Sequence, residues 1–210
     1  MNKIASFFKK RNAPFFIGPL WIGFTAFGFF SLLTYANKPG EVGKISNGWP
    51  PTSSLVANSA GPTLLIFSHP KCPCTRATAR ELERVMAQVQ GKPLTTYVLI
   101  YKPSDRNEEW AQTDLEKKFE SIPGVNVLMD VDGQEAARFG ALTSGQAFLY
   151  SKEGSLLFNG GITPSRGDEG DSVGKDSIAS LVVNGSTLHP TSRVFGCSFR
   201  KPANIGWKED

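Results

Sequence analysis

Cysteine is scarce in this chain, which has only three among 210 residues. An odd number leaves at least one thiol outside any set of internal disulfides, and so few cysteines exclude a small scaffold held together by disulfides. With 40% apolar and 20% charged residues, the chain also lacks the composition of a disordered or collagen-like protein. The three cysteines are therefore candidates for thiol chemistry rather than structural cross-links.

An excess of one charge is also missing from most of the chain. The formal net charge of +4 comes from 23 basic and 19 acidic residues. Four of the bases precede residue 13, where there is no acid, and removing them leaves as many bases as acids. The remainder is electrically neutral, so we expect no nucleic-acid partner.

A long apolar run follows this basic cluster. Residues 13–36 contain no charged side chain over 24 residues, and a helix of that length crosses a bilayer core at about 1.5 Å per residue. The apolar part of a cleavable signal peptide spans only about 7–15 residues and ends in an Ala-x-Ala-like site, for which Thr34-Tyr35-Ala36 is a weak match. We expect a single transmembrane anchor, with residues 1–12 in the cytoplasm and the remainder exported. Either interpretation places the domain where disulfides persist.

Residues 37–62 have the composition of a spacer. They hold four glycines and four prolines and show no apolar period. We predict a Gly/Pro-rich extended linker, with Trp49 resting either at the membrane interface or on the domain. The folded domain is then residues 63–210, a common size for a single core.

The domain alternates strand and helix patterns. The continuous apolar run 63–67 is typical of a strand buried on both faces, and apolar residues from Leu82 to Val89 recur at helical spacing. Further strands are predicted at 95–101, 125–129, 147–150 and 156–158, and further helices at 110–119, 134–139 and 176–183. This order indicates an α/β sandwich with a mixed central sheet.

The sharpest chemical feature is Cys72-Pro73-Cys74, between the first strand and its helix. Proline is favoured at the first helical position, which predicts Cys72 as the N-cap and Cys74 in the first turn. We expect both sulfurs to be open to solvent at the positive end of the helix, which lowers the pKa of a thiol. Arg76 adds positive charge nearby. A thiolate is both a nucleophile and a metal ligand, and the competing interpretation is two inert capping residues.

Three other residues can take part in this chemistry. Cys197, in the C-terminal tail, can resolve a disulfide with Cys72, act as a third metal ligand, or fill a gap between aromatic residues, and the sequence leaves these open. His69 lies three residues before Cys72 and can serve in acid–base chemistry or ligation, whereas His189 is typical of a loop. Arg166 can orient an anionic group or clamp its loop near the thiols.

The order of elements over residues 63–183 resembles that of thioredoxin-like proteins. The segments His69–Ala77, Thr143–Gly145 and Gly160–Gly167 further resemble a group of bacterial membrane-anchored thioredoxin-like proteins called RedB. The resemblance implies a thioredoxin-like three-layer sandwich with a mixed central sheet. It also implies protein thiols or disulfides as partners and a bacterial inner-membrane protein whose C-terminal domain is periplasmic.

Two departures from ordinary thioredoxins bear on activity. The usual Cys-x-x-Cys is one residue shorter here, so a Cys72–Cys74 disulfide would close a smaller ring and be more easily reduced. Gly145 stands in the apparent place of the thioredoxin cis-proline, a residue that helps bind substrate and shields the thiols from metals. Gly145 permits unusual backbone angles, and Thr143 and Ser144 can offer hydroxyls to a thiol, although a simple turn explains these three residues equally well.

The sequence favours a membrane-anchored thiol–disulfide oxidoreductase without a cofactor. Cys72 would attack or receive the mixed disulfide, and Cys74 or Cys197 would resolve it. The supporting residues are His69, Pro73, Arg76, Thr143, Ser144, Gly145 and Arg166. One alternative is a copper-binding or copper-delivery module that uses Cys72 and Cys74 with His69, Cys197 or His189. Another is an anchored assembly factor without turnover.

Overall fold

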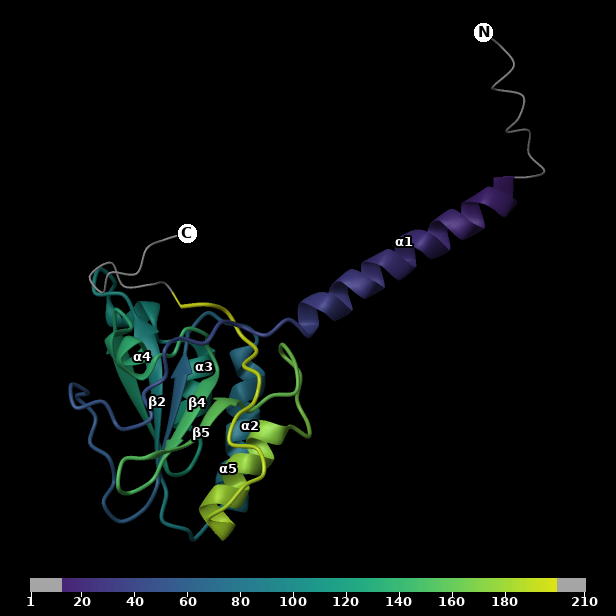
Figure 1. Ribbon diagram of the computed structural model, residues 1–210. Coiled ribbons are helices and arrows are strands. Elements are labelled where there is room, and N and C mark those ends of the chain that lie inside the picture. The colour runs from purple at the N-terminus through teal and green to yellow at the C-terminus, as the bar shows by residue number, and fades with distance from the viewer. Residues whose placement is uncertain (1–12, 200–210) are drawn as a thin grey trace. The chain divides into compact units, whose positions relative to one another are not determined.

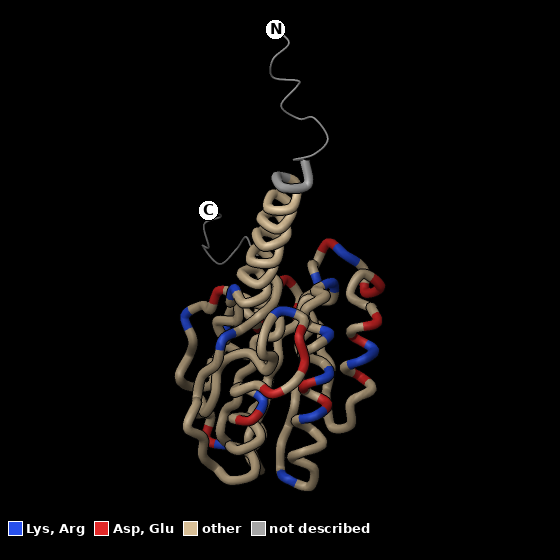
Figure 2. The backbone as a smooth tube through the Cα atoms, turned by 90° about the vertical axis from the view of Figure 1, so that its right-hand side faces the viewer, with Lys and Arg blue, Asp and Glu red and all other residues tan. Residues whose placement is uncertain are grey.

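The computed structural model describes residues 13–199, and the side chains from Ile17 onward. The chain divides into two compact units, of which one ends at Lys38 and the other begins at Pro39 (Figure 1). Figure 2 shows acidic and basic residues interspersed over the second unit and none along the helix of the first. Each unit is described separately below.

The first unit contains a single described helix, α1, which spans Ala13–Ala36 as predicted. Its segment from Ile17 to Ala36 is long and apolar enough to cross a membrane, and none of those side chains is buried within the protein. The hydroxyl groups inside the helix donate to backbone carbonyls four residues earlier, at Thr25, Ser31 and Thr34. Such bonds satisfy polar side chains without water, as an apolar solvent requires.

The second unit is built on a five-stranded mixed sheet with the strand order β3-β2-β1-β4-β5. Strands β1, β2 and β3 are mutually parallel, whereas β4 is antiparallel to both β1 and β5. Their bounds are Thr63–Ser68 for β1, Thr95–Lys102 for β2, Val125–Val131 for β3, Gln146–Tyr150 for β4 and Leu156–Gly161 for β5. All five predicted strands are confirmed.

Helices cover both faces of this sheet. Helices α2, α3 and α5 pack over one face, and α4 lies against β3 on the other (Figure 1). Their bounds are Thr75–Gln88 for α2, Asp114–Glu120 for α3, Gln134–Phe139 for α4 and Val173–Asn184 for α5, with a short 3-10 turn, η1, at Glu108–Trp110. The predicted three-layer arrangement is confirmed.

Strand β1 explains why one apolar run can serve two cores. Leu64 and Ile66 point into the cluster under α2 and α5, whereas Leu65 and Phe67 point into the cluster on the α4 face. Successive side chains of a strand alternate between faces, so a centre strand between two helical layers must be apolar throughout.

Two helix boundaries differ from the prediction. The predicted helix at 110–119 is divided into η1 and α3, because α3 starts only after Thr113, whose hydroxyl accepts a hydrogen bond from the backbone N–H of Glu116. Helix α5 begins at Val173, three residues earlier than predicted, because Ser172 caps it through the N–H of Lys175. In both cases a side-chain cap sets the start.

The Gly/Pro-rich segment predicted to be an extended linker packs against the domain from Pro39 onward. Trp49 makes perpendicular ring contacts with Phe139 and Tyr150, with centroids 5.2 and 5.3 Å away. The backbone N–H of Trp49 donates to the carbonyl of Gly154, and the backbone N–H of Leu156 donates to the carbonyl of Asn47. The tether interpretation is therefore wrong for these residues, which complete the core beside the short helix α4.

Candidate functional site

The Cys-Pro-Cys motif lies in the turn between β1 and α2. Helix α2 starts at Thr75, and Cys74 occupies the cap position without a side-chain hydrogen bond. The chain enters the helix through a turn of the 3-10 type, which is tighter than an α-helical turn. Its hydrogen bonds run from the N–H groups of Thr75, Arg76 and Ala77 to the carbonyls three residues earlier. The prediction that Cys72 is the N-cap is therefore wrong: Cys72 lies one turn ahead of the α-helix.

Cys72 is covered rather than open to solvent. Its exposed fraction is only 2%, while Cys74 and Cys197 are partly exposed. The Cys72 sulfur lies 3.1 Å from the sulfur of Cys197, within hydrogen-bond distance for two thiols. The expectation of two open sulfurs at one helix end is wrong for Cys72, whose sulfur contacts the C-terminal tail.

The tail reaches Cys72 by pairing with the loop that precedes β4. The Ser144 N–H donates to the carbonyl of Cys197 at 2.8 Å, and the Phe199 N–H donates to the carbonyl of Leu142 at 2.9 Å. Gly196 is needed for this approach, because a Cβ there would overlap the Ser144 carbonyl oxygen. A backbone ladder therefore sets the position of Cys197.

Two hydroxyl side chains, those of Thr75 and Ser144, form a network beside the sulfurs. The Thr75 hydroxyl bonds to the Cys72 sulfur and lies 2.7 Å from the hydroxyl of Ser144. The Ser144 hydroxyl also accepts the N–H of His69 at 2.8 Å. The Thr143 hydroxyl instead donates to the carbonyl of Glu41. Of the two predicted hydroxyl donors, Ser144 joins the thiol network through Thr75, and Thr143 holds the N-terminal segment of the second unit at Glu41.

The three thiols differ in acidity. Burial by itself raises the pKa of Cys72, but hydrogen bonds with Thr75 and Cys197 outweigh it and bring that pKa below its ordinary value. Burial, the hydrogen bond to Cys72 and the negative charge of Cys72 raise the pKa of Cys197 to about 12. Of this pair, Cys72 is therefore the thiol that ionises more readily.

Cys74 has a different environment. Burial and the charge of Cys72 raise the pKa of Cys74, and the guanidinium of Arg166 partly opposes them. The same guanidinium donates to the carbonyl of Gly196 at 2.5 Å. Arg166 thus contacts both Cys74 and the C-terminal tail.

The loop that carries Arg166 is fixed to α2. Glu81, fully buried, accepts the backbone N–H of Gly170 at 2.8 Å and faces Lys175 at 3.7 Å. At the surface, Glu169 pairs with Arg80 at 2.8 Å. Helix α2, which follows Cys74, therefore holds both the motif and the loop that carries Arg166.

His69 belongs to an aromatic cluster at the edge of the site. Its ring stacks on Tyr101 at 5.6 Å and is perpendicular to Trp110 at 5.8 Å, while its Nδ1 accepts the N–H of Lys71. Burial and the positive charge of Lys71 lower the pKa of His69, which favours the neutral imidazole. Phe199 of the tail packs on the same Tyr101, with centroids 6.1 Å apart.

Gly145 has a geometry that proline cannot adopt. Its φ is +91°, and its N–H donates to the carbonyl of Phe67 at 2.7 Å. Proline has no N–H and a φ near −65°. A Cβ at this position would also lie 2.9 Å from the Thr78 hydroxyl. Within residues 13–199 no peptide bond is cis, so the loop reaches the site by a different backbone path from the one a cis-proline provides.

The structure brings together most of the predicted site residues. Cys72, Cys74, Cys197, Ser144 and Arg166 are linked by the contacts above. Two candidates lie apart from them: the side chain of Arg76 is exposed on the first turn of α2, and His189 is exposed beyond α5. Pro73 is exposed in the turn, where its carbonyl accepts the N–H of Arg76.

The sequence interpretation missed Thr75, Gly196 and Phe199. Thr75 carried a usable signal, since a hydroxyl directly after a cysteine at a helix start can reach a sulfur one turn back. Gly196 and Phe199 act through pairing with a loop more than 50 residues away, which no local pattern reveals.

The copper alternative uses Cys72 and Cys74 as thiolate ligands, helped by His69, Cys197 or His189. Across residues 13–199, no group of three or more His, Cys, Asp or Glu side chains is arranged to hold a metal ion. One nitrogen of His69 is already engaged by Lys71. The copper alternative stays a prediction.

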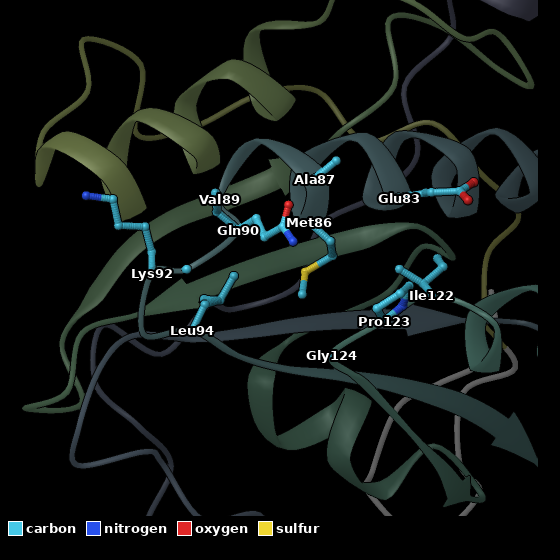
Figure 3. A pocket seen from close by; sticks show the side chains of 11 residues that line it. Glu83, Met86, Ala87, Val89, Gln90, Lys92, Leu94, Ile122, Pro123 and Gly124 are labelled. Carbon is cyan, nitrogen blue, oxygen red and sulfur yellow. The ribbon is translucent and has the colours of Figure 1, made fainter.

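The domain also has an apolar cavity of about 450 Å³, lined by Met86, Val89, Leu94, Ile122 and neighbouring residues (Figure 3). It lies at the C-terminal end of α2, whereas the cysteines precede the N-terminal end of that helix. A helix of 14 residues is about 21 Å long, so the cavity is separate from the thiols.

No protein-family model and no curated protein sequence matches this chain. Among solved structures, the chain is similar to a hypothetical protein from Sinorhizobium meliloti, with a TM-score of 0.61 and 17% identity, covering 80% of this chain and 100% of that one. It is also similar to an uncharacterized conserved protein from Geobacillus kaustophilus, with a TM-score of 0.55 and 17% identity, covering 81% and 94%.

A secreted disulfide oxidoreductase from Mycobacterium tuberculosis, described as homologous to DsbE of E. coli, matches with a TM-score of 0.41 and 20% identity, covering 60% of this chain and 82% of that one. That likeness is too distant to carry an argument about the site. The class of the second unit follows from its own topology: the mixed sheet order and the helices on both faces define a thioredoxin-like fold, as predicted.

Proposed function

We propose that this protein is a thiol–disulfide oxidoreductase in which Cys72 is the nucleophile and Cys197 the resolving thiol. The observation that carries the proposal is the 3.1 Å separation of their sulfurs, combined with a Cys72 pKa below its ordinary value. A thiolate attacks disulfides, and a second thiol within reach releases the product. The sequence left the resolving role open between Cys74 and Cys197. Cys74 also contacts Cys72, and we assign the role to Cys197 because its sulfur lies 3.1 Å from that of Cys72.

The exchange takes place in two balanced steps. The Cys72 thiolate attacks one sulfur of a substrate disulfide, forms a mixed disulfide and releases the other substrate sulfur as a thiolate. Cys197 then loses its proton and attacks the Cys72 sulfur, which forms the Cys72–Cys197 disulfide and releases the second substrate thiolate. The substrate gains two electrons and the protein dithiol loses them, and the reverse sequence oxidises a substrate dithiol.

The high pKa of Cys197 suits this order of events. It is raised by burial and also by the hydrogen bond and the charge of the Cys72 thiolate. Both contributions from Cys72 end when its sulfur enters a mixed disulfide, so the Cys197 pKa falls when its thiolate is required. Cys197 is a weak competitor for substrate before that point.

We also propose that α1 anchors this domain in a bacterial inner membrane, with residues 1–12 cytoplasmic and the domain periplasmic. The uncharged run from Ala13 to Ala36 and the basic residues before it support this topology. The likeness to the RedB group rests on the three motifs of the sequence and remains part of this proposal. Its consequence is an oxidising compartment for the thiols.

Turnover assays on the full-length protein in detergent micelles test the function. With dithiothreitol as reductant and insulin as disulfide substrate, we expect the Cys72→Ser variant to lose activity and the Cys74→Ser variant to keep most of it. The Cys197→Ser variant should accumulate a mixed disulfide on Cys72, detected by mass spectrometry under non-reducing conditions. Activity of the Cys72→Ser variant equal to that of the unsubstituted protein would reject the proposal.

A further inference from the structure

The C-terminal strap, defined as residues Val194–Phe199, occupies the approach to Cys72. Val194, Phe195 and Gly196 are buried, whereas Cys197 and Phe199 are half-buried and Ser198 is exposed. The strap therefore has an anchored half and an outer half. The outer half carries the sulfur that touches Cys72.

Among the described residues, the outer half is held by backbone hydrogen bonds and by the packing of Phe199 against the cluster on the α4 face. Two backbone hydrogen bonds join it to the loop before β4, one from the Ser144 N–H and one from the Phe199 N–H. Phe199 packs against Tyr101, and Arg166 holds the carbonyl of Gly196 at the boundary between the two halves. Segments held by few bonds near the surface open locally at lower free energy than the core does.

We propose that the strap is a built-in gate over Cys72, which must lift before the disulfide of another protein can reach the sulfur. This inference rests on the proposed function and adds regulation of the same site. A nucleophile with 2% exposure, in contact with the strap through Cys197, cannot accept an approaching protein sulfur while the outer half is in place. The fraction of time the gate is open then scales the rate of attack on protein substrates.

Oxidation locks the gate. When a disulfide of another protein or of glutathione accepts two electrons, Cys72 and Cys197 lose two protons, form one sulfur–sulfur bond and convert the outer half into a covalent loop over the motif. Reduction by a dithiol breaks that bond and restores both thiols. The strap is therefore fixed in the oxidised protein and free to lift in the reduced one.

Gly196 and Gly48 provide a matched pair of variants. Neither glycine has a positive φ, so alanine introduces no backbone strain at either. A Cβ at Gly196 overlaps the Ser144 carbonyl oxygen and pushes the strap outward, whereas a Cβ at Gly48 meets only the Gly154 carbonyl oxygen, at 3.9 Å. Both changes are made in a Cys74→Ser, Cys197→Ser background of the full-length protein, so that Cys72 is the sole thiol.

The readout is the alkylation rate of Cys72 by iodoacetamide and by a bulky maleimide that carries a polyethylene glycol chain. Rates are followed up to alkaline pH, and the plateau values are compared so that a change in pKa does not enter. We expect Gly196→Ala to raise the plateau rate about tenfold, and more for the bulky reagent, because the rate follows the open fraction. Gly48→Ala should leave both rates unchanged.

Phe199→Ala is a second route to the open state if Gly196→Ala perturbs folding, which thermal unfolding will reveal. Plateau rates of both variants equal to that of the background protein would overturn the gate. If the two variants are labelled faster but the protein with all three cysteines does not reduce insulin, the gate is retained and the proposed function is rejected. Insulin reduction with unchanged labelling would retain the function and reject the gate.

Discussion

The sulfur of Cys72 lies 3.1 Å from the sulfur of Cys197, although 125 residues separate them in the chain. Cys74, only two residues from Cys72, contacts both the Cys72 thiol and the guanidinium of Arg166. Cys72 is therefore the thiol that the other two cysteines share as a neighbour. This arrangement leads to the following predictions.

Replacing Thr75 by Val should raise the pKa of Cys72. The Thr75 hydroxyl bonds to the Cys72 sulfur and favours its ionised form, so its loss leaves burial less opposed. At a fixed pH below that pKa, less thiolate is present and reaction slows. The measurement is the pH dependence of thiolate absorbance in the background with Cys72 as the sole thiol. Thr75→Ser, which keeps the hydroxyl, is the control, and an unchanged midpoint for Thr75→Val would contradict the network.

Replacing Trp49 by Ala should destabilise the second unit. Trp49 packs edge-on against Phe139 and Tyr150, and loss of a partly buried aromatic side chain costs about 2–3 kcal/mol in free energy of unfolding. Urea unfolding of the full-length protein in micelles measures it. Val56→Ala, at a side chain that is 76% exposed, is the control and should change stability by less than about 0.5 kcal/mol. Equal stability of the two variants would restore the tether interpretation.

Asp130 should make stability depend on mildly acidic pH. Burial raises its pKa to about 6, although the N–H groups of Glu135 and Ala136 oppose this shift. Between about pH 4 and pH 6 the folded state binds more protons than the unfolded state, so this carboxyl contributes less stability as the pH rises.

The Asp130→Asn variant isolates that contribution. Titrating groups that do not interact with Asp130 are present in both proteins and cancel in the difference between their free energies of unfolding, whereas the charge of Glu135 interacts with that of Asp130. We expect the unsubstituted protein to lose stability relative to Asp130→Asn as the pH is raised through this window, measured by urea unfolding at several pH values. A difference independent of pH would show that Asp130 titrates at its ordinary pKa.

The sequence predicts the layers of this fold because their signals are local. The apolar run of β1 and the helical spacing from Leu82 to Val89 identify the centre strand and the helix after the motif, since each reflects burial of consecutive neighbours. Pro73 predicts a helix start at the motif but places it two residues too early, since the N-cap is Cys74 and not Cys72. These features depend on a few residues close in sequence.

The features that sequence could not supply depend on distant pairing. Cys197 reaches Cys72 because the tail forms backbone bonds with residues 142–144, and backbone bonds leave no mark on residue type. The prediction of a free linker at residues 39–62 was wrong for a related reason. Glycine and proline are as common in a segment that packs along a domain surface as in a free spacer. The contact between Cys72 and Cys197 depends on the same tail, so it could not be predicted from the motif.

The most direct test is to identify the disulfide of the oxidised protein. Full-length protein is oxidised with oxidised glutathione, its remaining thiols are alkylated, and peptides are analysed without reduction by mass spectrometry. The account predicts a peptide pair linked through Cys72 and Cys197, with Cys74 alkylated. A Cys72–Cys74 linkage with Cys197 alkylated, or alkylation of all three cysteines, would contradict it.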